Sequence, residues 1–446
     1  MESDVVVVGS GVGGATVARE LSIRGYKVTI IEKGGYHKLG TARRALNFYS
    51  GSLWNFCPGE LSKEGTEVLR TIMVGGSSMV TLGNGVRAFQ TGFKAMGIDL
   101  DKEFDEAEAE LGVAPLPERL MGERTRRLRE ASEEVGYKVK PMPKFVDFDR
   151  CRSCGLCVLG CRYGAKWTSQ KFLSEARRAG AKILTETSVD EVIHSGGEVK
   201  GLKVHKESSG ASEINAGNVV LAAGGIGTPI ILQKSGLENA GSNLFLDLFV
   251  NTYGILNDGH MEEEMGMATV IDELHESQGF ILSPILDMFL DMFLYLPLLK
   301  KLRAFRRDRT LGLMTKIVDE DVGKVNPDGT LSKPVTESDR KKLSRGEEIS
   351  KEILLQAGVN PKSLYTTKVR GAHPGGTAGI GRVVNTDQET EVDRLFVSDA
   401  SIFPKPLGIP PVLTIVAVSK RFSKRLASEY LKVKKAAPET KPSIKR

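Results

Sequence analysis

Four cysteines with regular spacing lie near the middle of the sequence. They are Cys151, Cys154, Cys157 and Cys161, in C-x2-C-x2-C-x3-C spacing, and the chain has five cysteines in all. This spacing is typical of bacterial ferredoxins, where thiolates hold an iron–sulfur cluster. We therefore expect one [4Fe–4S] cluster here, with Cys161 as its local fourth ligand.

The ligand set of this site has alternatives. Cys57, in the stretch NFCPGE, is a remote cysteine followed by proline. In ferredoxins such a residue can complete the first cluster, so Cys57 is the alternative to Cys161. Four thiolates could also bind zinc, although zinc sites usually use two well-separated C-x2-C pairs. A metal-free remnant of a cluster site is the third interpretation.

A glycine motif near the N-terminus indicates a different chemistry. Gly9, Gly11 and Gly14 form G-x-G-x-x-G, and Glu32 follows the next apolar run. Gly9 permits a tight turn, Gly11 lets the backbone approach a pyrophosphate, and Gly14 lets helix and strand pack closely. Glu32 is placed to accept hydrogen bonds from ribose hydroxyls and would repel a 2′-phosphate. The motif predicts dinucleotide binding, but not of NADP.

The elements around these glycines form a βαβ unit. The valine run at 4–8 predicts a buried parallel strand, followed by a helix over 15–24 and a second strand over 27–31. The free N–H groups at the start of that helix suit phosphate binding.

Two later segments repeat the sequence strand, loop and helix. Residues 216–237 predict a strand, a glycine-rich turn and a helix that opens at Thr228-Pro229, since proline is favoured at the start of a helix. Residues 393–430 predict a strand, a proline-rich loop and a closing amphipathic helix. A further loop of small residues covers 74–87.

Composition and charge indicate a soluble globular protein with two or more lobes. The chain has 446 residues, 40% of them apolar and 26% charged, with a formal charge of +6. No basic stripe suggests a nucleic-acid partner, and residues 433–446 predict a disordered basic tail. The N-terminus has no secretion signal, so we expect a cytoplasmic protein, in which clustered cysteines bind metal more often than they form disulfides.

One long apolar segment, at 279–307, has to be tested as a membrane span. Two aspartates, Asp287 and Asp291, and two prolines interrupt it, which a spanning helix would not tolerate well. We interpret it as an amphipathic or buried helix. Its basic C-terminal flank would also suit peripheral contact with a membrane surface.

Several motifs together resemble the glucose-methanol-choline (GMC) oxidoreductases, a family of flavoproteins. They are GSGVGGA with Glu32, VGGSS at 74–78, GGIGTPIILQKSGL at 224–237, AHPGGTAGIG at 372–381, and VSDASIFP with PPVLTI at 397–415. They occur in family order. The run from Gly160 to Lys166 is similar to that of long-chain alcohol oxidases and dehydrogenases.

The resemblance implies FAD and an α/β fold. We expect a discontinuous Rossmann-like FAD-binding domain and an α+β substrate domain with an antiparallel sheet and an inserted cysteine-rich segment. The expected boundaries are 1–95, 169–240 and 385–432 for the FAD-binding domain, 96–168 for the helical and cysteine-rich segment, 241–384 for the substrate domain and 433–446 for the tail.

The resemblance also implies roles for single residues. His373, in the family's H-P-x-G-T motif, would accept the hydroxyl proton of an alcohol, and an imidazole titrates close to working pH. Asp399 would hydrogen-bond the ribityl-pyrophosphate region. The full set of expected cofactor-binding residues is Gly9, Gly11, Gly13, Gly14, Glu32, Lys33, Gly75, Gly76, Ser77, Ser78, Asn84, Ala223, Gly224, Asp399 and Pro411.

The chain departs from the family pattern at Pro410. The family usually has a second His or Asn there, which helps to bind the substrate hydroxyl or its alkoxide, whereas proline offers no side-chain donor or acceptor. Asn84 or Thr81 could take over this role.

These observations predict hydride transfer between flavin and an alcohol, with a long-chain or lipid-like alcohol as the expected substrate. Electrons would pass through the cluster to a one-electron carrier such as ferredoxin, which favours a dehydrogenase or reductase over an oxidase. One alternative is a flavin reductase, fed by ferredoxin, that acts on a C=C bond of an isoprenoid or other lipid. Another is an electron-transfer subunit without substrate chemistry, which His373 argues against.

Overall fold

The computed structural model describes residues 3–37, 61–289, 292 and 298–431. Valine-rich strands form a parallel sheet in it. All its strand pairs are parallel, in the order β21-β11-β1-β2-β7. The bounds are β1 (Val5–Val8), β2 (Val28–Ile31), β7 (Lys182–Leu184), β11 (Val219–Leu221) and β21 (Leu395–Val397). Because these strands come from distant parts of the chain, the Rossmann-like sheet is discontinuous, as the sequence predicts.

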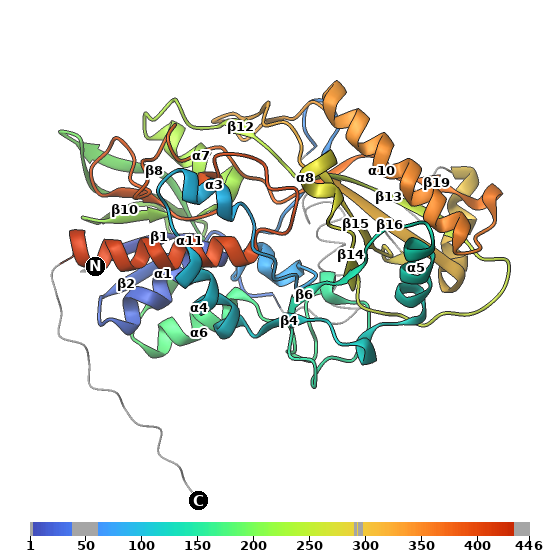
Figure 1. Cartoon of the computed structure of the whole chain (residues 1–446). Coiled ribbons are helices and arrows are strands. Elements are labelled where there is room, and N and C mark those ends of the chain that lie inside the picture. Colours follow the sequence, from blue (N-terminus) through green and yellow to red (C-terminus); the bar gives the residue numbers. More distant parts are fainter. Residues whose placement is uncertain (1–2, 38–60, 290–291, 293–297, 432–446) are drawn as a thin grey trace, which may run out of the picture.

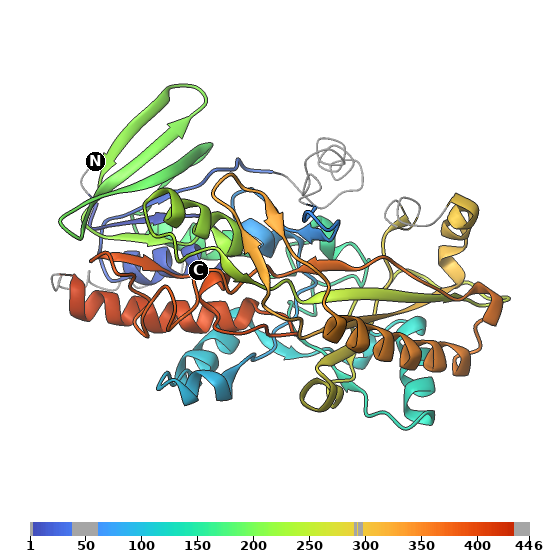
Figure 2. The same cartoon turned by 90° about the horizontal axis from the view of Figure 1, so that it is seen from above.

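Four helices lie together beside this sheet (Figure 1). They are α1 (Val12–Ile23), α4 (Asp101–Leu111), α6 (Ser169–Arg178) and α11 (Val412–Arg425). Helix α1 contacts both α6 and α11, and α11 also contacts α4. Helix α7 (Gly224–Lys234) contacts β8 of a three-stranded antiparallel sheet, which projects from this lobe in Figure 2. That sheet consists of β8 (Thr187–Ser195), β9 (Glu198–Lys206) and β10 (Gly210–Asn215).

A larger sheet forms the second lobe. Its order is β15-β16-β13-β20-β3, with β19 also paired to β13, and all pairs are antiparallel except β20 with β3. The bounds are β3 (Glu67–Leu69), β13 (Leu248–Ile255), β15 (Phe280–Pro284), β16 (Thr310–Ile317), β19 (Tyr365–Thr366) and β20 (Arg370–Ala372). Helix α10 (Glu337–Gln356) covers β13 and β16 and contacts α5 (Glu123–Glu134).

The remaining helices and strands are short. They are α3 (Gln90–Ala95), β4 (Val113–Pro115), β5 (Lys140–Pro141), β6 (Pro143–Phe145), β12 (Ser242–Leu244), β14 (Thr269–Val270), α8 (Leu274–Gln278), β17 (Gly323–Val325) and β18 (Leu331–Ser332). The cysteine segment lies between β6 and α6 and contains one short 3-10 turn, Cys157–Leu159.

The expected helix over 279–307 is wrong in its first part. Phe280–Pro284 is strand β15, fully buried beside β16, and Leu298–Arg309 forms 3-10 turns. An apolar run without helical periodicity suits a buried strand equally well, which explains the error. Asp291 lies outside the described residues. No helix in the described part of the chain is both long and apolar enough to cross a bilayer.

Two helices begin earlier than the sequence predicts. Helix α1 begins at Val12 instead of residue 15, so Gly13 and Gly14 lie inside it. Helix α7 begins at Gly224, which places Pro229 within the helix. Proline has no N–H for the carbonyl of Gly225, and the Thr377 hydroxyl donates to that oxygen at 2.8 Å instead. This substitute bond makes the internal proline tolerable.

Candidate active site

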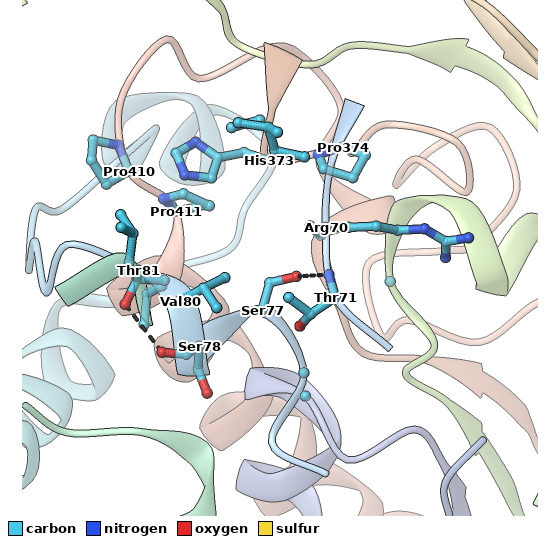
Figure 3. A pocket seen from close by; sticks show the side chains of 18 of the residues that line it. Arg70, Thr71, Ser77, Ser78, Val80, Thr81, His373, Pro374, Pro410 and Pro411 are labelled. Atoms are coloured by element: carbon cyan, nitrogen blue, oxygen red, sulfur yellow. Dashed lines mark hydrogen bonds between the residues drawn. The ribbon is translucent and has the colours of Figure 1, made fainter. Parts of the chain in front are cut away.

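A cavity of about 1100 Å³ extends between the two lobes. One wall is the loop after β1 together with Glu32 at the end of β2, where the carboxyl ends of the parallel strands meet. The opposite wall comes from the second sheet and includes Phe249, Met314 and Lys316. Ligands of open parallel sheets bind at such strand ends. The cavity therefore joins the predicted dinucleotide site to His373, which also lines it (Figure 3).

The glycines of the first loop have separate structural roles. Gly9 has φ +104°, and a Cβ there would meet the Ala222 carbonyl oxygen at 2.2 Å. A Cβ on Gly14 would meet the Gly9 oxygen at 2.1 Å, so Gly14 permits the close packing that the motif predicts. Gly11 has no atom within 4 Å of its Cβ position, which leaves its face open toward a ligand.

Gly13 has a role that the motif does not reveal. A Cβ on Gly13 would lie 1.8 Å from the Ser398 carbonyl oxygen, directly after β21. The residue therefore allows α1 to pass against the last strand of the sheet. Gly13 also lines the cavity, so its predicted contact with the cofactor stays a prediction.

The Glu32 carboxylate fixes the shape of the glycine loop. Its Oε2 accepts hydrogen bonds from the Ser10 N–H at 2.9 Å and the Ser10 hydroxyl at 2.6 Å, and Oε1 accepts from the Gly34 N–H at 2.7 Å. Burial raises the pKa of Glu32 despite these bonds. Glu32 and the exposed Lys33 both line the cavity, and their contacts with the cofactor stay predictions.

The second small-residue loop packs against the first. A Cβ on Gly76 would lie 2.9 Å from Gly11 Cα, and the Gly75 N–H donates to the Ser10 hydroxyl at 3.0 Å. The hydroxyl oxygen of Ser77 accepts a hydrogen bond from the Thr71 N–H at 3.1 Å (Figure 3). The Ser78 hydroxyl donates to the Gly75 oxygen at 2.6 Å. The two serine side chains are thus used to hold the loop.

Asp399 organises the start of α7. Its Oδ2 accepts hydrogen bonds from the Gly224 N–H at 2.7 Å and the Thr228 hydroxyl at 2.6 Å, and its Oδ1 accepts from the Ser401 N–H at 2.8 Å. The Ala223 N–H donates to the same Thr228 hydroxyl at 3.0 Å. Burial raises the pKa of Asp399. Its direct contact with the ribityl-pyrophosphate region stays a prediction, beside this positioning role.

His373 is held by a buried carboxylate. Its Nδ1 lies 3.0 Å from Asp247 Oδ2, and the Asp247 side chain is 0% exposed while that of His373 is 23% exposed. Asp247 Oδ1 accepts from the Gly408 N–H at 2.8 Å. With Asp247 ionised, this contact assigns the proton to Nδ1 and leaves a lone pair on Nε2. Burial and the charge of Lys316 hold the pKa of His373 well below its usual value.

Lys316 completes the polar end of the cavity. Its Nζ lies 3.3 Å from His373 Nδ1, and burial lowers the pKa of Lys316 to about 8. Sequence reasoning missed both Asp247 and Lys316, which are 126 and 57 residues from His373. The available signal was a lone charge within an apolar stretch, in FLDLFV and LMTKIV.

The residues proposed for the role lost at Pro410 have other partners. Pro410 lies near the His373 ring in Figure 3, and Pro411 is the N-cap residue of α11. Asn84 is buried, and its Oδ1 accepts from Lys144 Nζ at 2.6 Å. The Thr81 hydroxyl donates to the Ser78 oxygen at 3.2 Å. Both residues line the cavity, but their polar atoms already have bonds within the chain.

The four cysteines of the ferredoxin-like run line one small pocket. The Ser153 N–H donates to Cys151 Sγ at 3.5 Å, and the Ala165 N–H donates to Cys161 Sγ at 3.3 Å. Burial raises the pKa of the Cys151 and Cys157 thiols. Among the described residues, no group of three or more His, Cys, Asp or Glu side chains is arranged to hold a metal ion. Cys57 lies outside that part of the chain, so the iron–sulfur and zinc interpretations both stay predictions.

Sequence comparison identifies the protein family. The N-terminal GMC oxidoreductase family model matches residues 3–249, and the C-terminal model matches residues 323–419. The chain belongs to the GMC oxidoreductase family. The family assignment and the expected fold class are therefore confirmed, and the enzyme is an FAD-dependent oxidoreductase. The ferredoxin-like cysteine motif is not part of what these matches confirm.

Individual relatives agree with this assignment. The uncharacterized protein MJ1450 of Methanocaldococcus jannaschii is 33% identical, over 95% of this chain and 99% of that protein. Long-chain-alcohol oxidase FAO4A of Arabidopsis thaliana is 27% identical, over 94% of this chain and 68% of that protein.

Two solved structures share the fold. Pyridoxine 4-oxidase from Mesorbium loti matches with a TM-score of 0.71 and 19% identity, over 95% of this chain and 99% of that chain. Formate oxidase of Aspergillus oryzae matches with a TM-score of 0.72 and 16% identity, over 96% and 98%.

Proposed function

We propose that this GMC oxidoreductase oxidises a primary alcohol with a long apolar chain. The observation that carries the proposal is the contact between His373, which faces the cavity, and the buried Asp247 carboxylate. FAD, when bound, supplies the two-electron acceptor for the hydride of the carbinol carbon. The residues expected to hold it are Glu32, the 74–78 loop and the glycine loop. Within the glycine loop, the open face at Gly11 leaves room for a pyrophosphate.

His373 acts as the base in this proposal. Its Nε2 accepts the hydroxyl proton of the alcohol, and Asp247 keeps the ring oriented by accepting the Nδ1 proton. The resulting imidazolium is stabilised by the adjacent carboxylate.

The wall around His373 supports an apolar substrate. Phe249, Met267, Met314 and Ile285 belong to one apolar cluster and also line the cavity. Relatives named long-chain-alcohol oxidases support the same substrate class.

The test is anaerobic reduction of the purified holoenzyme by ethanol, decanol and hexadecanol. The readout is the loss of visible flavin absorbance. We expect rapid reduction by the long alcohols and slow reduction by ethanol. No reduction by any of them would refute the proposal, and reduction of a lipid C=C bond by the chemically reduced enzyme would favour the reductase alternative.

A second candidate function concerns the electron acceptor. The cysteine pocket shares Gly155 and Met265 with the main cavity, so a [4Fe–4S] cluster there would border that cavity. Such a cluster would pass single electrons to a carrier such as ferredoxin, in the cytoplasm, and make the protein a dehydrogenase. Iron, zinc and sulfide analysis after anaerobic purification separates the cluster from a zinc site. Stoichiometric hydrogen peroxide during turnover in air would instead indicate an oxidase.

A further inference from the structure

Lys316 is a buried cation at the reactive end of the cavity. The residue is 4% exposed and lies on strand β16. Met314, two positions earlier, therefore points to the same face of the strand, and both residues line the cavity. The cavity thus has an apolar wall that ends in an ammonium group beside His373.

The ammonium of Lys316 differs from those of the other buried lysines. Lys144 and Lys166 each donate to three oxygen atoms within 3.1 Å. Lys420 contacts three carboxylates within 3.5 Å, and Lys333 binds Asp319 at 2.7 Å as well as a carbonyl oxygen. Within the described residues, Lys316 has one hydrogen-bonding contact, with His373 Nδ1 at 3.3 Å.

That single contact cannot satisfy the ammonium group. The Nδ1 atom also lies 3.0 Å from Asp247 Oδ2, and a nitrogen that donates its proton to a carboxylate has no lone pair for a second donor. An ammonium group has three N–H donors. A buried cation with unused donors at a cavity is the arrangement expected where a ligand oxygen completes the set.

We infer that Lys316 binds the substrate oxygen and takes the place of the donor that Pro410 cannot supply. The inference rests on the proposed alcohol oxidation for its chemical role. When the hydroxyl proton passes to His373 Nε2, the O–H bond breaks and its electron pair stays on the oxygen. The Lys316 N–H groups then hold the negative charge that develops there.

The experiment measures binding, so that it does not depend on turnover. The probes are decanoate, which presents a negatively charged oxygen, and neutral decanamide of similar shape. Calorimetric titration of the oxidised holoenzyme is expected to show roughly 10- to 100-fold tighter binding of decanoate, as a hydrogen bond to a charged group provides. Equal affinities in the unaltered enzyme would overturn the inference without any variant.

Variants then assign the preference to Lys316. K316M is expected to abolish the preference for decanoate, and K316R to retain most of it. K342M is the matched control, because Lys342 donates to the Val318 carbonyl close to the end of β16 and does not line the cavity. A K316M enzyme that keeps its FAD and still prefers decanoate would refute the role. If decanoate binds as expected but no alcohol reduces the flavin, the proposed reaction fails while the oxygen site stands.

Discussion

Asp247 Oδ2 lies 3.0 Å from His373 Nδ1, although the two residues are 126 positions apart in the sequence. Asp247 stands just before β13 and His373 just after β20, and these two strands pair with each other. Sheet pairing therefore creates the contact, and the imidazole of His373 is oriented by a carboxylate that is fully buried. We therefore expect the reactivity of the site to depend on this pair.

Replacing His373 by asparagine should remove the base. We expect the rate of flavin reduction by decanol to fall by roughly 10²- to 10⁴-fold, the usual contribution of a positioned general base. FAD content and thermal stability should change little, because the ring faces the cavity. Stopped-flow reduction under anaerobic conditions measures the rate, and an unaltered rate would show that His373 is not the base.

The D247N variant tests the orienting role separately. Asparagine has the shape of aspartate but cannot stabilise the imidazolium that forms when Nε2 accepts a proton. We expect kcat to fall by roughly 10²-fold or more, with a smaller change in the affinity for decanamide. A drop in affinity alone, with kcat retained, would mean that Asp247 only shapes the pocket.

The pH profile of kcat/KM should be bell-shaped. Burial raises the pKa of Asp247 to about 6, so below that pH the protonated carboxyl no longer holds the Nδ1 proton. Burial lowers the pKa of Lys316 to about 8, so above that pH the oxygen-binding charge is lost. The pKa of His373 lies well below 6.5, and the ring stays neutral between the two limbs.

Two variants identify the limbs of this profile. D247N should lack the acidic limb and K316M the basic limb, because each removes the titrating group. Asp319 belongs to the same cluster, and burial raises the pKa of its carboxyl to about 6. Because these groups interact, the pH values of the two limbs belong to the cluster as a whole. Persistence of the basic limb in K316M would assign it to another residue.

Local sequence patterns were sufficient for the nucleotide-binding half of the fold. Strand β1, helix α1 and the glycine loop follow from residues that are neighbours in sequence, such as Gly9 and Gly14. The pairing of Asp247 and Lys316 with His373 follows from strand order in the second sheet, which no local pattern encodes. The 279–307 segment failed because its apolar run has no period that separates a strand from a helix. The role of Gly13 required the position of Ser398, which lies 385 residues later.

The glycine loop offers a matched pair of substitutions. In G13A the new methyl would lie 1.8 Å from the Ser398 oxygen, a backbone atom that cannot easily move. We expect the FAD-free protein to lose about 1–3 kcal/mol of unfolding free energy. In G11A the methyl meets no atom within 4 Å, so the FAD-free protein should lose no more than about 1 kcal/mol.

In G11A we expect the main effect on FAD affinity and not on stability. The methyl of G11A occupies the open face where the pyrophosphate is expected, so the Kd for FAD should rise by roughly tenfold or more, about 1.4 kcal/mol. Thermal unfolding of the FAD-free proteins and fluorescence titration with FAD measure the two effects. Unchanged FAD binding in G11A would move the pyrophosphate away from this loop.

The cysteine pocket gives the last prediction. Cys161 lines the same pocket as the first three cysteines, and the Ala165 N–H donates to its sulfur, as N–H groups do to cluster ligands. We therefore expect C161S to lose iron together with C151S, C154S and C157S, while C57S keeps it.

Lys166 connects this pocket to the cavity wall, since its Nζ donates hydrogen bonds to the carbonyl oxygens of Cys157 at 2.9 Å and Thr81 at 2.6 Å. Iron loss should consequently slow reoxidation of the flavin by an artificial one-electron acceptor but leave its reduction by decanol intact. Zinc in the purified protein, or full iron in C161S, would contradict this ligand set.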